Sequence, residues 1–273
     1  MIAHRFKEAT YLQFTQLSAY SAQLSHFVST RLGGFSDGPY NGLNLGRGTA
    51  DDRRLVEQNY QLLGGLLGWD NRPWCVPGQI HSKTVTLVTP DNAASFCNPD
   101  RSTVPKADAL ITNSTGIALT VLSADCTTIL LYDPVRQAIG AIHAGWRGTV
   151  QHIAAETVRA MQHHFDTNPA DLRVGIAPCI GMPVYEVGDE VVTAVHEAFG
   201  TLDQLVTYHP ASGKPHFNLK SANRQSLIQA GVRPNHIEIA PYCSYDDDDW
   251  FYSHRRDKGI TGRFGSGLML LPQ

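Results

Sequence analysis

Short apolar runs separated by turn-forming residues dominate the middle of the chain. Four of them occupy residues 109–112, 117–122, 128–132 and 138–142. Uninterrupted apolar runs of this length, bounded by turn signals, are typical of strands that are buried on both faces. We therefore expect these four segments to form the middle of a β-sheet.

Helical spacing of apolar residues alternates with these strand-like runs. The segments expected as helices are one capped by Asp51 or Asp52 and closed by Gly68, one that opens at Thr149, and those at 187–199 and 219–230. Further strands are expected at 23–30, 172–177 and 236–240. This order predicts an α/β (or α+β) fold, with a single catalytic domain over 1–273 in which helices flank a mixed sheet.

Composition narrows the class of protein. The net charge is −3, and no run of Lys and Arg is long enough to follow a row of phosphates, so nucleic acid is not an expected partner. The chain start lacks a secretion-signal pattern, and no apolar stretch reaches membrane-spanning length. The five cysteines form no Cys-x-x-Cys pair, which argues against a disulfide framework. We expect a cytoplasmic protein with free thiols and no membrane partner.

The sharpest candidate chemistry involves Cys126, His143 and His81. Cys126 precedes one apolar run and His143 follows the next, so antiparallel strands would bring them together, and His81 lies near the start of another expected strand. Two imidazoles and a thiolate suit Zn²⁺, and three protein ligands leave the fourth position open, as in catalytic zinc sites. Copper can occupy the same ligands. Spacing alone also fits a buried thiol and two histidines with purely structural roles.

A second candidate feature directly follows His143. The segment His143-Ala-Gly-Trp-Arg-Gly-Thr places a glycine-containing turn before a helix, where free backbone N–H groups attract an anion. Arg147 would add a bidentate donor there. A tight strand-to-helix connection with an exposed arginine explains the pattern equally well. Asp125 is a candidate base beside Cys126, although acidic residues in turns are commonly caps.

Several motifs, in order along nearly the whole chain, resemble one known family. The motifs are Arg31-Leu-Gly-Gly-Phe-Ser, Gln79-Ile-His-Ser, Ala107-Asp-Ala-Leu-Ile-Thr, Ser123-Ala-Asp-Cys-Thr, His143-Ala-Gly-Trp-Arg-Gly-Thr, Gly175-Ile-Ala-Pro-Cys-Ile-Gly, and Phe251-Tyr-Ser-His-Arg-Arg-Asp followed by Thr261-Gly-Arg. Together they are similar to the multicopper polyphenol oxidase (laccase-like) family of bacterial purine nucleoside phosphorylases. The sequence departs from that pattern at Cys243-Ser244, where Cys-Thr is expected, and in the four aspartates before Trp250.

The resemblance implies both a ligand set and an activity. The family's metal ligands fall on His81, Cys126 and His143, and the implied reaction is phosphorolysis of adenosine, inosine, guanosine and methylthioadenosine, with an accessory adenosine deaminase activity. On this reading phosphate binds at Arg147, at the helix start at Thr149 and at Arg47. Arg147 and Asp125 are the candidate catalytic residues.

Three rival readings use the same atoms. One is a copper-dependent polyphenol oxidase, although twelve scattered histidines without a His-x-His pair do not suit several coppers. The second is a metal-free cysteine hydrolase with Cys126 as nucleophile and His143 as base. The third is a metal-binding protein without turnover.

Residues 91–106 are polar with two prolines, and we expect an exposed loop there that can act as a lid.

Overall fold

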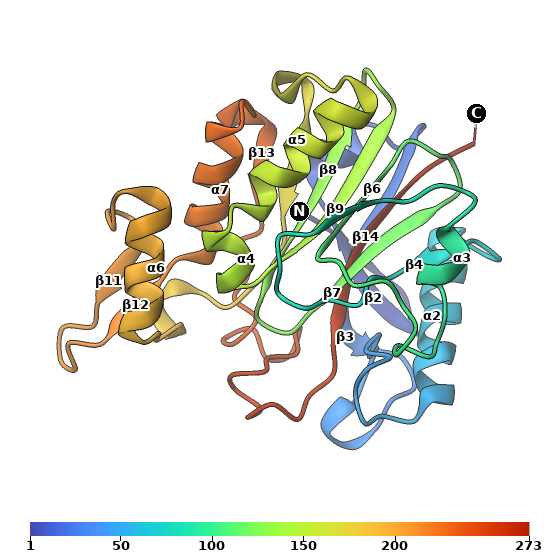
Figure 1. Cartoon of the computed structure of the whole chain (residues 1–273). Coiled ribbons are helices and arrows are strands. Elements are labelled where there is room, and N and C mark those ends of the chain that lie inside the picture. Colours follow the sequence, from blue (N-terminus) through green and yellow to red (C-terminus); the bar gives the residue numbers. More distant parts are fainter. Residues whose placement is uncertain (273) are drawn as a thin grey trace.

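Two six-stranded β-sheets pack face to face, and helices cover their outer surfaces (Figure 1). This computed structural model describes residues 1–272. Side chains of both sheets are buried together between them, among them Leu119 and Phe264 from one sheet and Leu130 and Ile139 from the other. The mixed α/β class expected from the sequence is confirmed, with two sheets in place of one.

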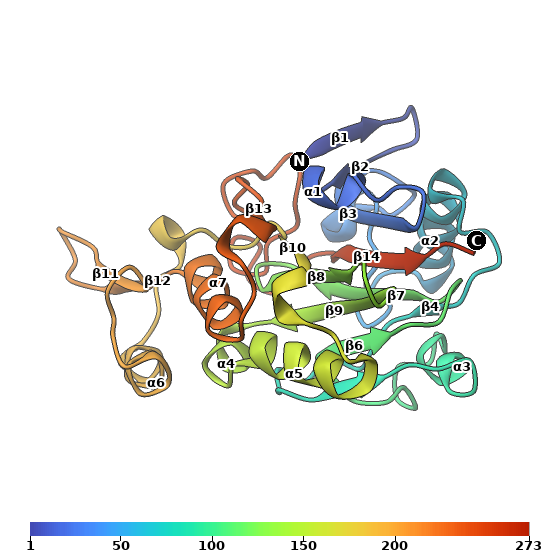
Figure 2. The ribbon, with the colours of Figure 1, turned by 90° about the horizontal axis from the view of Figure 1, so that it is seen from above.

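The first sheet combines both ends of the chain. Its strand order is β1 (Ile2–Arg5), β2 (Ala9–Gln13), β3 (Leu24–Gly33), β14 (Phe264–Leu270), β7 (Ala118–Ser123) and β4 (Trp74–Cys75). Neighbouring strands are antiparallel except β4, which runs parallel to β7. Because the C-terminal strand β14 lies between β3 and β7, the residues that precede it reach the middle of the molecule (Figure 2).

The second sheet contains most of the strands expected from the apolar runs. Its order is β13 (Ile237–Ile239), β10 (Arg173–Ile176), β8 (Thr127–Asp133), β9 (Ala138–Ala144), β6 (Ala109–Thr112) and β5 (Val85–Leu87). The four central strands are antiparallel, and parallel strands flank them. All four apolar runs are strands as expected, but 117–122 belongs to the first sheet. The chain therefore crosses between the sheets at the turn from β7 to β8.

Helices cover the outer face of each sheet. The first sheet is covered by α2 (Arg53–Leu67), which buries Val56, Tyr60 and Leu63. The caps expected for this helix are confirmed, since the side chain of Asp52 accepts a hydrogen bond from the Arg54 amide and Gly68 closes the helix with φ of 68°. The second sheet is covered by α5 (Ile153–Phe165) and α7 (Leu219–Gln229).

A smaller unit extends from the sheets on one side (Figure 2). It is built from α6 (Asp189–Phe199) and the hairpin of β11 (Val206–Tyr208) and β12 (Pro215–Phe217), and it has a hydrophobic cluster of its own. The remaining short elements are α1 (Thr15–Ser18), α3 (Ala93–Phe96), α4 (Trp146–Val150) and the 3₁₀ turns Gly38–Tyr40, Pro169–Asp171, Met182–Val184 and Pro234–His236. No helix within residues 1–272 is long and apolar enough to cross a membrane.

The helix expected to open at Thr149 is interrupted, which corrects the sequence-based boundary. The helix α4 begins at Trp146, so Thr149 lies inside it, and α5 starts separately at Ile153. His152 between them has a left-handed backbone with φ of 57°. Its Nε2 lies 3.0 Å from the Ala198 carbonyl oxygen, a tertiary contact with α6 that periodicity within one segment cannot reveal.

The segment 91–106 is not simply an exposed loop. It contains α3, and Phe96 and Val104 are buried in the core between the sheets. Arg101 donates hydrogen bonds to the carbonyl oxygens of Val76 and Pro77, which holds the segment against the chain after β4. Isolated apolar residues in a polar context have no periodicity, so the sequence did not indicate this packing.

Close packing between α1 and the second sheet generates a stability prediction. A Cβ atom on Gly175 of β10 would lie 2.3 Å from the buried ring of Phe14, so Gly175→Ala should lower the free energy of unfolding by about 1–3 kcal/mol. Gly65→Ala on the exposed face of α2 is the matched control, because no atom lies closer than 3.9 Å to its added Cβ. Denaturant unfolding measures both variants. Equal stability of the two would contradict this account of the packing.

Candidate active site

Three segments meet where the two sheets approach each other at one end. The turn from β7 to β8 carries Cys126, and the end of β9 carries His143, which lies opposite Thr128 in the antiparallel register. His81 lies in the connection between β4 and β5, with a left-handed backbone φ of 61°. The sequence argument that antiparallel strands bring Cys126 and His143 together therefore describes the observed geometry.

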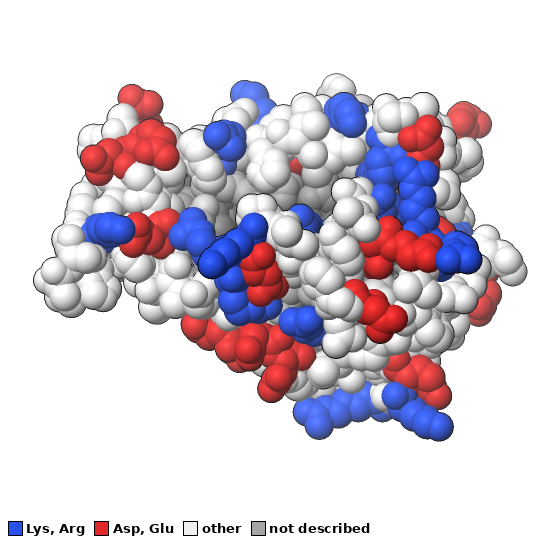
Figure 3. All heavy atoms as spheres, turned by 90° about the horizontal axis from the view of Figure 1, so that it is seen from below, with Lys and Arg blue, Asp and Glu red and all other residues white. Residues whose placement is uncertain are grey.

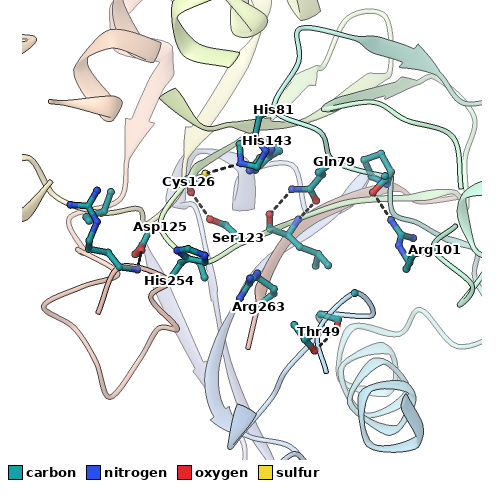
Figure 4. Close-up of a pocket in the computed structure, with 18 of the residues that line it drawn as sticks. Thr49, Gln79, His81, Arg101, Ser123, Asp125, Cys126, His143, His254 and Arg263 are labelled. Carbon is teal, nitrogen blue, oxygen red and sulfur yellow. Dashed lines mark hydrogen bonds between the residues drawn. The ribbon is translucent and has the colours of Figure 1, made fainter. Parts of the chain in front are cut away.

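The three side chains form one compact cluster (Figure 4). Their candidate ligand atoms lie within 4.8 Å of one another, and the Cys126 Sγ lies 3.8 Å from the His81 Nε2. His143 is buried, Cys126 is half-buried and His81 is exposed, so the cluster opens to one side. A tetrahedral metal ion with sulfur at about 2.3 Å and nitrogen at about 2.0 Å requires ligand atoms roughly 3.3–3.6 Å apart, and the separation of Cys126 Sγ from His81 Nε2 already approaches this value.

Gly145 leaves room beside the cluster. A Cβ atom at this position would lie 2.8 Å from the His81 ring and 2.9 Å from the Cys126 Sγ. Any other residue would therefore displace the two side chains. This close approach explains why glycine occupies the turn after His143. The two imidazoles and the thiolate of the cluster fit a single soft or borderline metal ion.

The buried carboxylate of Asp108 organises both histidines. Its Oδ1 lies 2.9 Å from the His143 Nδ1 and accepts from the His81 amide at 3.0 Å. Its Oδ2 accepts from the amide and the hydroxyl of Ser82 at 2.6 and 2.8 Å. With Nδ1 of His143 engaged, Nε2 is the ring nitrogen available to a metal, which is the usual carboxylate–histidine arrangement at metal sites.

Electrostatics favour the charged forms of these groups in the metal-free chain. Burial opposes ionisation of Cys126, but the neighbouring His143 and His81 outweigh it and lower the pKa of the thiol to about 6. Burial likewise opposes protonation of His143, yet Cys126 and Asp108 raise the pKa of the imidazole to about 9. These shifts favour the thiolate–imidazolium form of the pair, from which a metal ion that binds His143 displaces a proton.

Asp125 ties the Cys126 turn to the C-terminal part of the chain. Its backbone has φ of 97°, its Oδ1 accepts from the Ser244 hydroxyl at 2.6 Å, and its Oδ2 accepts from the Arg255 amide at 2.7 Å. Both carboxylate oxygens therefore accept hydrogen bonds that connect the Cys126 turn to Ser244 and Arg255. Asp125 also lines the cavity described next, and its catalytic role stays a prediction.

A cavity of about 620 Å³ opens beside the cluster, and His81, Cys126 and His143 all line it. Four Lys and Arg side chains line it as well, against the single carboxylate of Asp125: Arg101, Lys106, Arg255 and Arg263. Figure 3 shows a hollow on this face with Lys and Arg around it. The cavity is therefore suited to an anion held close to the candidate metal site.

None of these four cavity cations was named as a site residue by reasoning from the sequence. Lys106 and Arg101 belong to the segment expected as a lid, while Arg255 and Arg263 precede β14. The exposed imidazole of His254 lines the cavity beside Arg255. His254, Arg255 and Arg263 belong to the terminal motifs that carry the family resemblance. Those motifs did not indicate that the three side chains would line one cavity with the metal ligands.

The residues expected to bind phosphate are not among those that line this cavity. Arg47 forms a two-bond ion pair with Glu57, at 2.7 and 2.9 Å, and lies over the Tyr60 ring. Arg147 is exposed and lies over the Trp146 ring, 4.5 Å from its centroid. Thr149 is buried, and its hydroxyl accepts a hydrogen bond from Asn223. The structure thus brings together the three expected metal ligands and Asp125, and places Arg47, Arg147 and Thr149 elsewhere.

Replacing the Asp108 carboxylate should weaken metal binding. Burial would raise the pKa of Asp108, but hydrogen bonds from His143 and Ser82 lower it to about 2, so the group is ionised at neutral pH. Asp108→Asn replaces one carboxylate oxygen by an NH₂ group, which cannot accept the hydrogen bonds that these donors make. The dissociation constant for Zn²⁺, measured by chelator competition, should rise about 10- to 100-fold.

Metal binding should also depend on pH. Because binding displaces a proton from His143, the affinity of the unmodified protein for Zn²⁺ should increase from pH 6 to pH 9.

Asp133→Asn provides a matched control for this measurement. Asp133 is equally buried, but it accepts from the amides of Val135 and Arg136 at the opposite end of β8. Its substitution should leave the dissociation constant for Zn²⁺ unchanged. Unchanged affinity in Asp108→Asn, or an equal loss in both variants, would remove Asp108 from the metal site.

Comparisons with known proteins agree with this architecture. A structure titled YlmD, from Geobacillus stearothermophilus, matches with a TM-score of 0.90 and 31% identity over 99% of both chains. A hypothetical protein YfiH from Bacillus licheniformis matches with a TM-score of 0.89 and 32% identity, over 97% of this chain and 98% of that one.

Relatives found by sequence carry enzyme names. A protein from Bacteroides thetaiotaomicron named purine nucleoside phosphorylase is 34% identical over 97% of both chains. A protein of an unknown prokaryotic organism named adenosine deaminase RL5 is 35% identical over 84% of this chain and 87% of its own. The family model described as multi-copper polyphenol oxidoreductase laccase matches residues 25–271. The chain therefore belongs to the multi-copper polyphenol oxidoreductase laccase family.

Proposed function

We propose that this chain is a zinc-dependent purine nucleoside phosphorylase. The observation that carries the proposal is that one cavity is lined both by the open His81, Cys126 and His143 cluster and by four cationic side chains. The names of the relatives, purine nucleoside phosphorylase and adenosine deaminase, support this reaction class. The proposed substrates are adenosine, inosine, guanosine and methylthioadenosine with phosphate, and adenosine deamination is the proposed side activity.

The metal would be held by the three clustered side chains. Two imidazoles and one thiolate suit Zn²⁺, and three protein ligands leave a coordination position for substrate or water. When bound, zinc supplies Lewis-acid polarisation of a substrate atom or of water. The carboxylate of Asp108 fixes the His143 ring, and the amides of His81 and Ser82 donate to the same carboxylate, so the ligands are oriented before any metal binds.

Phosphorolysis requires an anionic nucleophile close to the sugar. A phosphate oxygen forms a bond to C1′ of the ribose while the bond from C1′ to N9 of the purine breaks, and the electron pair and a proton go to the purine. We propose that Arg263, Lys106 and Arg255 attract and position phosphate, because they line the cavity. Arg101 also lines it, but backbone carbonyls engage both of its terminal nitrogens, whereas they engage only one in Arg255 and in Arg263. Asp125 and His254 are the proposed groups for proton transfer.

The apolar part of the cavity suits a planar base. Leu122, Ile180 and Tyr185 line it, and the Arg255 guanidinium lies over the Tyr185 ring, 5.3 Å from the centroid. Aromatic and guanidinium planes bind nucleobases by stacking. We propose that the purine binds in this part of the cavity, next to the cations.

One rival reaction has an observation in its favour. The lowered pKa of Cys126 and the raised pKa of His143 also suit a metal-free cysteine hydrolase in which Cys126 is the nucleophile and His143 the base that holds its proton. Such an enzyme would use water instead of phosphate. For polyphenol oxidation by several coppers, residues 1–272 contain one cluster of three candidate ligands, and further copper sites would need ligands outside it.

Phosphate dependence is the experiment that tests the proposal. The metal-containing protein should convert inosine to hypoxanthine and ribose 1-phosphate only when phosphate is present, as measured by chromatography of both products. Hypoxanthine release at an equal rate without phosphate would identify a hydrolase. Absence of product from inosine, adenosine, guanosine and methylthioadenosine alike would favour a metal-binding protein without turnover.

The same assay distinguishes the two sets of phosphate residues. Arg263→Ala removes a cavity cation and should raise the KM for phosphate by about tenfold or more, as expected for loss of a charge-assisted hydrogen bond. Arg147→Ala is the matched control, because this arginine is exposed and does not line the cavity. An increase in KM in Arg147→Ala alone would restore the assignment made from the sequence.

A further inference from the structure

Two cysteines outside the candidate active site lie next to each other. Cys75 is the last residue of β4, and Cys97 is the C-cap of α3. Their Sγ atoms are 4.0 Å apart, and both thiols lie within hydrogen-bond distance of the Ala93 carbonyl oxygen, at 3.5 and 3.2 Å. A disulfide requires about 2.05 Å between the sulfurs, so the pair is reduced but needs only a small movement to form a bond.

The two thiols have unequal environments. Cys75 is fully buried, whereas Cys97 is half-buried and can meet a small solute. A hydrogen bond from the Cys75 thiol lowers the pKa of Cys97, and the positive charge of Arg47 adds to this against the effect of burial. The same hydrogen bond and burial raise the pKa of Cys75. Cys97 is therefore the more reactive thiol and Cys75 the neighbouring partner.

Arg47 does not line the cavity, and its positive charge acts on Cys97. Its Nε and one terminal nitrogen are bound by Glu57, and its side chain is 8% exposed. Within residues 1–272 its remaining nitrogen, Nη1, is buried without a hydrogen-bond partner. A buried guanidinium with an unused donor favours a negative charge nearby, and a thiolate at Cys97 supplies one.

We propose that Cys75 and Cys97 are an oxidative modification site, at which a peroxide converts the two thiols to a reversible disulfide. The Cys97 thiolate attacks one peroxide oxygen, the O–O bond breaks, and a sulfenic acid and hydroxide form. The Cys75 sulfur then attacks the sulfenic sulfur, the S–O bond breaks, and water leaves with the Cys75 proton. Both thiols are oxidised and the peroxide is reduced, and an added dithiol reverses the reaction by exchange.

The disulfide would act on the segment that brings cations to the cavity. Arg101 and Lys106 follow Cys97 within the same loop, and both line the cavity. Arg101 also bonds the carbonyl oxygens of Val76 and Pro77, directly after Cys75. A covalent link from β4 to the start of this loop adds to the restraint that Arg101 already provides, so the loop should open less often in the oxidised protein. This inference does not depend on the proposed reaction.

Peptide mapping of the metal-containing protein tests the site. After brief treatment with hydrogen peroxide and alkylation of the remaining thiols, mass spectrometry without reductant should find the Cys75 and Cys97 peptides joined with loss of two hydrogen atoms. Dithiothreitol should separate them. Hydrogen exchange of residues 98–104 should slow several-fold in the oxidised protein and return to the original rate after reduction.

Matched variants make the result decisive. Cys97→Ser should abolish the link, while Cys243→Ser should retain it, because Cys243 is also half-buried but its Sγ accepts from the Gly181 amide on the other side of the site. Cys97 found only as sulfinic or sulfonic acid, or linked to another cysteine, would overturn the proposal. A correct link with unchanged hydrogen exchange would overturn its effect on the loop.

Discussion

The buried carboxylate of Asp108 is the interaction on which the candidate site depends. A charge that is removed from water costs several kcal/mol unless donors surround it. Here the donors are the amides of Ile80, His81 and Ser82, the Ser82 hydroxyl and the His143 ring. One side chain thus fixes the left-handed backbone of His81 and the orientation of His143. The requirement to satisfy this charge prepares the ligands for a metal ion.

The arrangement of the two sheets determines what surrounds those ligands. The chain crosses from the first sheet to the second at the turn that carries Cys126, and Asp125 ties this turn to Ser244 and Arg255. Because β14 is inserted between β3 and β7, the segment before it delivers Arg255 and Arg263 to the cavity. The cationic wall and the metal ligands therefore come from distant parts of the sequence.

Local patterns in the sequence predicted the local structure well. The four apolar runs are strands, and the caps of α2 lie where Asp52 and Gly68 indicate. The assembly of two sheets was not predicted, because β14 pairs with β3 and β7, which are distant in the sequence, and a continuous apolar run does not tell which sheet it joins. The short helix α4 illustrates the same limit, since the conformation of His152 depends on a contact with α6.

The site shows the same division between local and distant information. Antiparallel pairing of neighbouring strands was sufficient to bring Cys126 and His143 together, and His81 was proposed from its place near the start of another expected strand before the family resemblance supported it. Sequence reasoning placed the anion site at Arg147 because that arginine follows His143 in the chain, whereas Lys106, Arg255 and Arg263 line the cavity. Asp108 belongs to one of the motifs of the family resemblance. Nothing in its sequence context indicated that its carboxylate would form hydrogen bonds to the segments of both His81 and His143.

His81, Cys126 and His143 are proposed to bind one metal ion. X-ray absorption spectroscopy on protein purified without added metal tests this proposal most directly. The account predicts about one zinc per chain, with one sulfur at about 2.3 Å and two imidazole nitrogens at about 2.0 Å, and loss of this metal in Cys126→Ala. A metal environment without sulfur, or full metal content in Cys126→Ala, would contradict it.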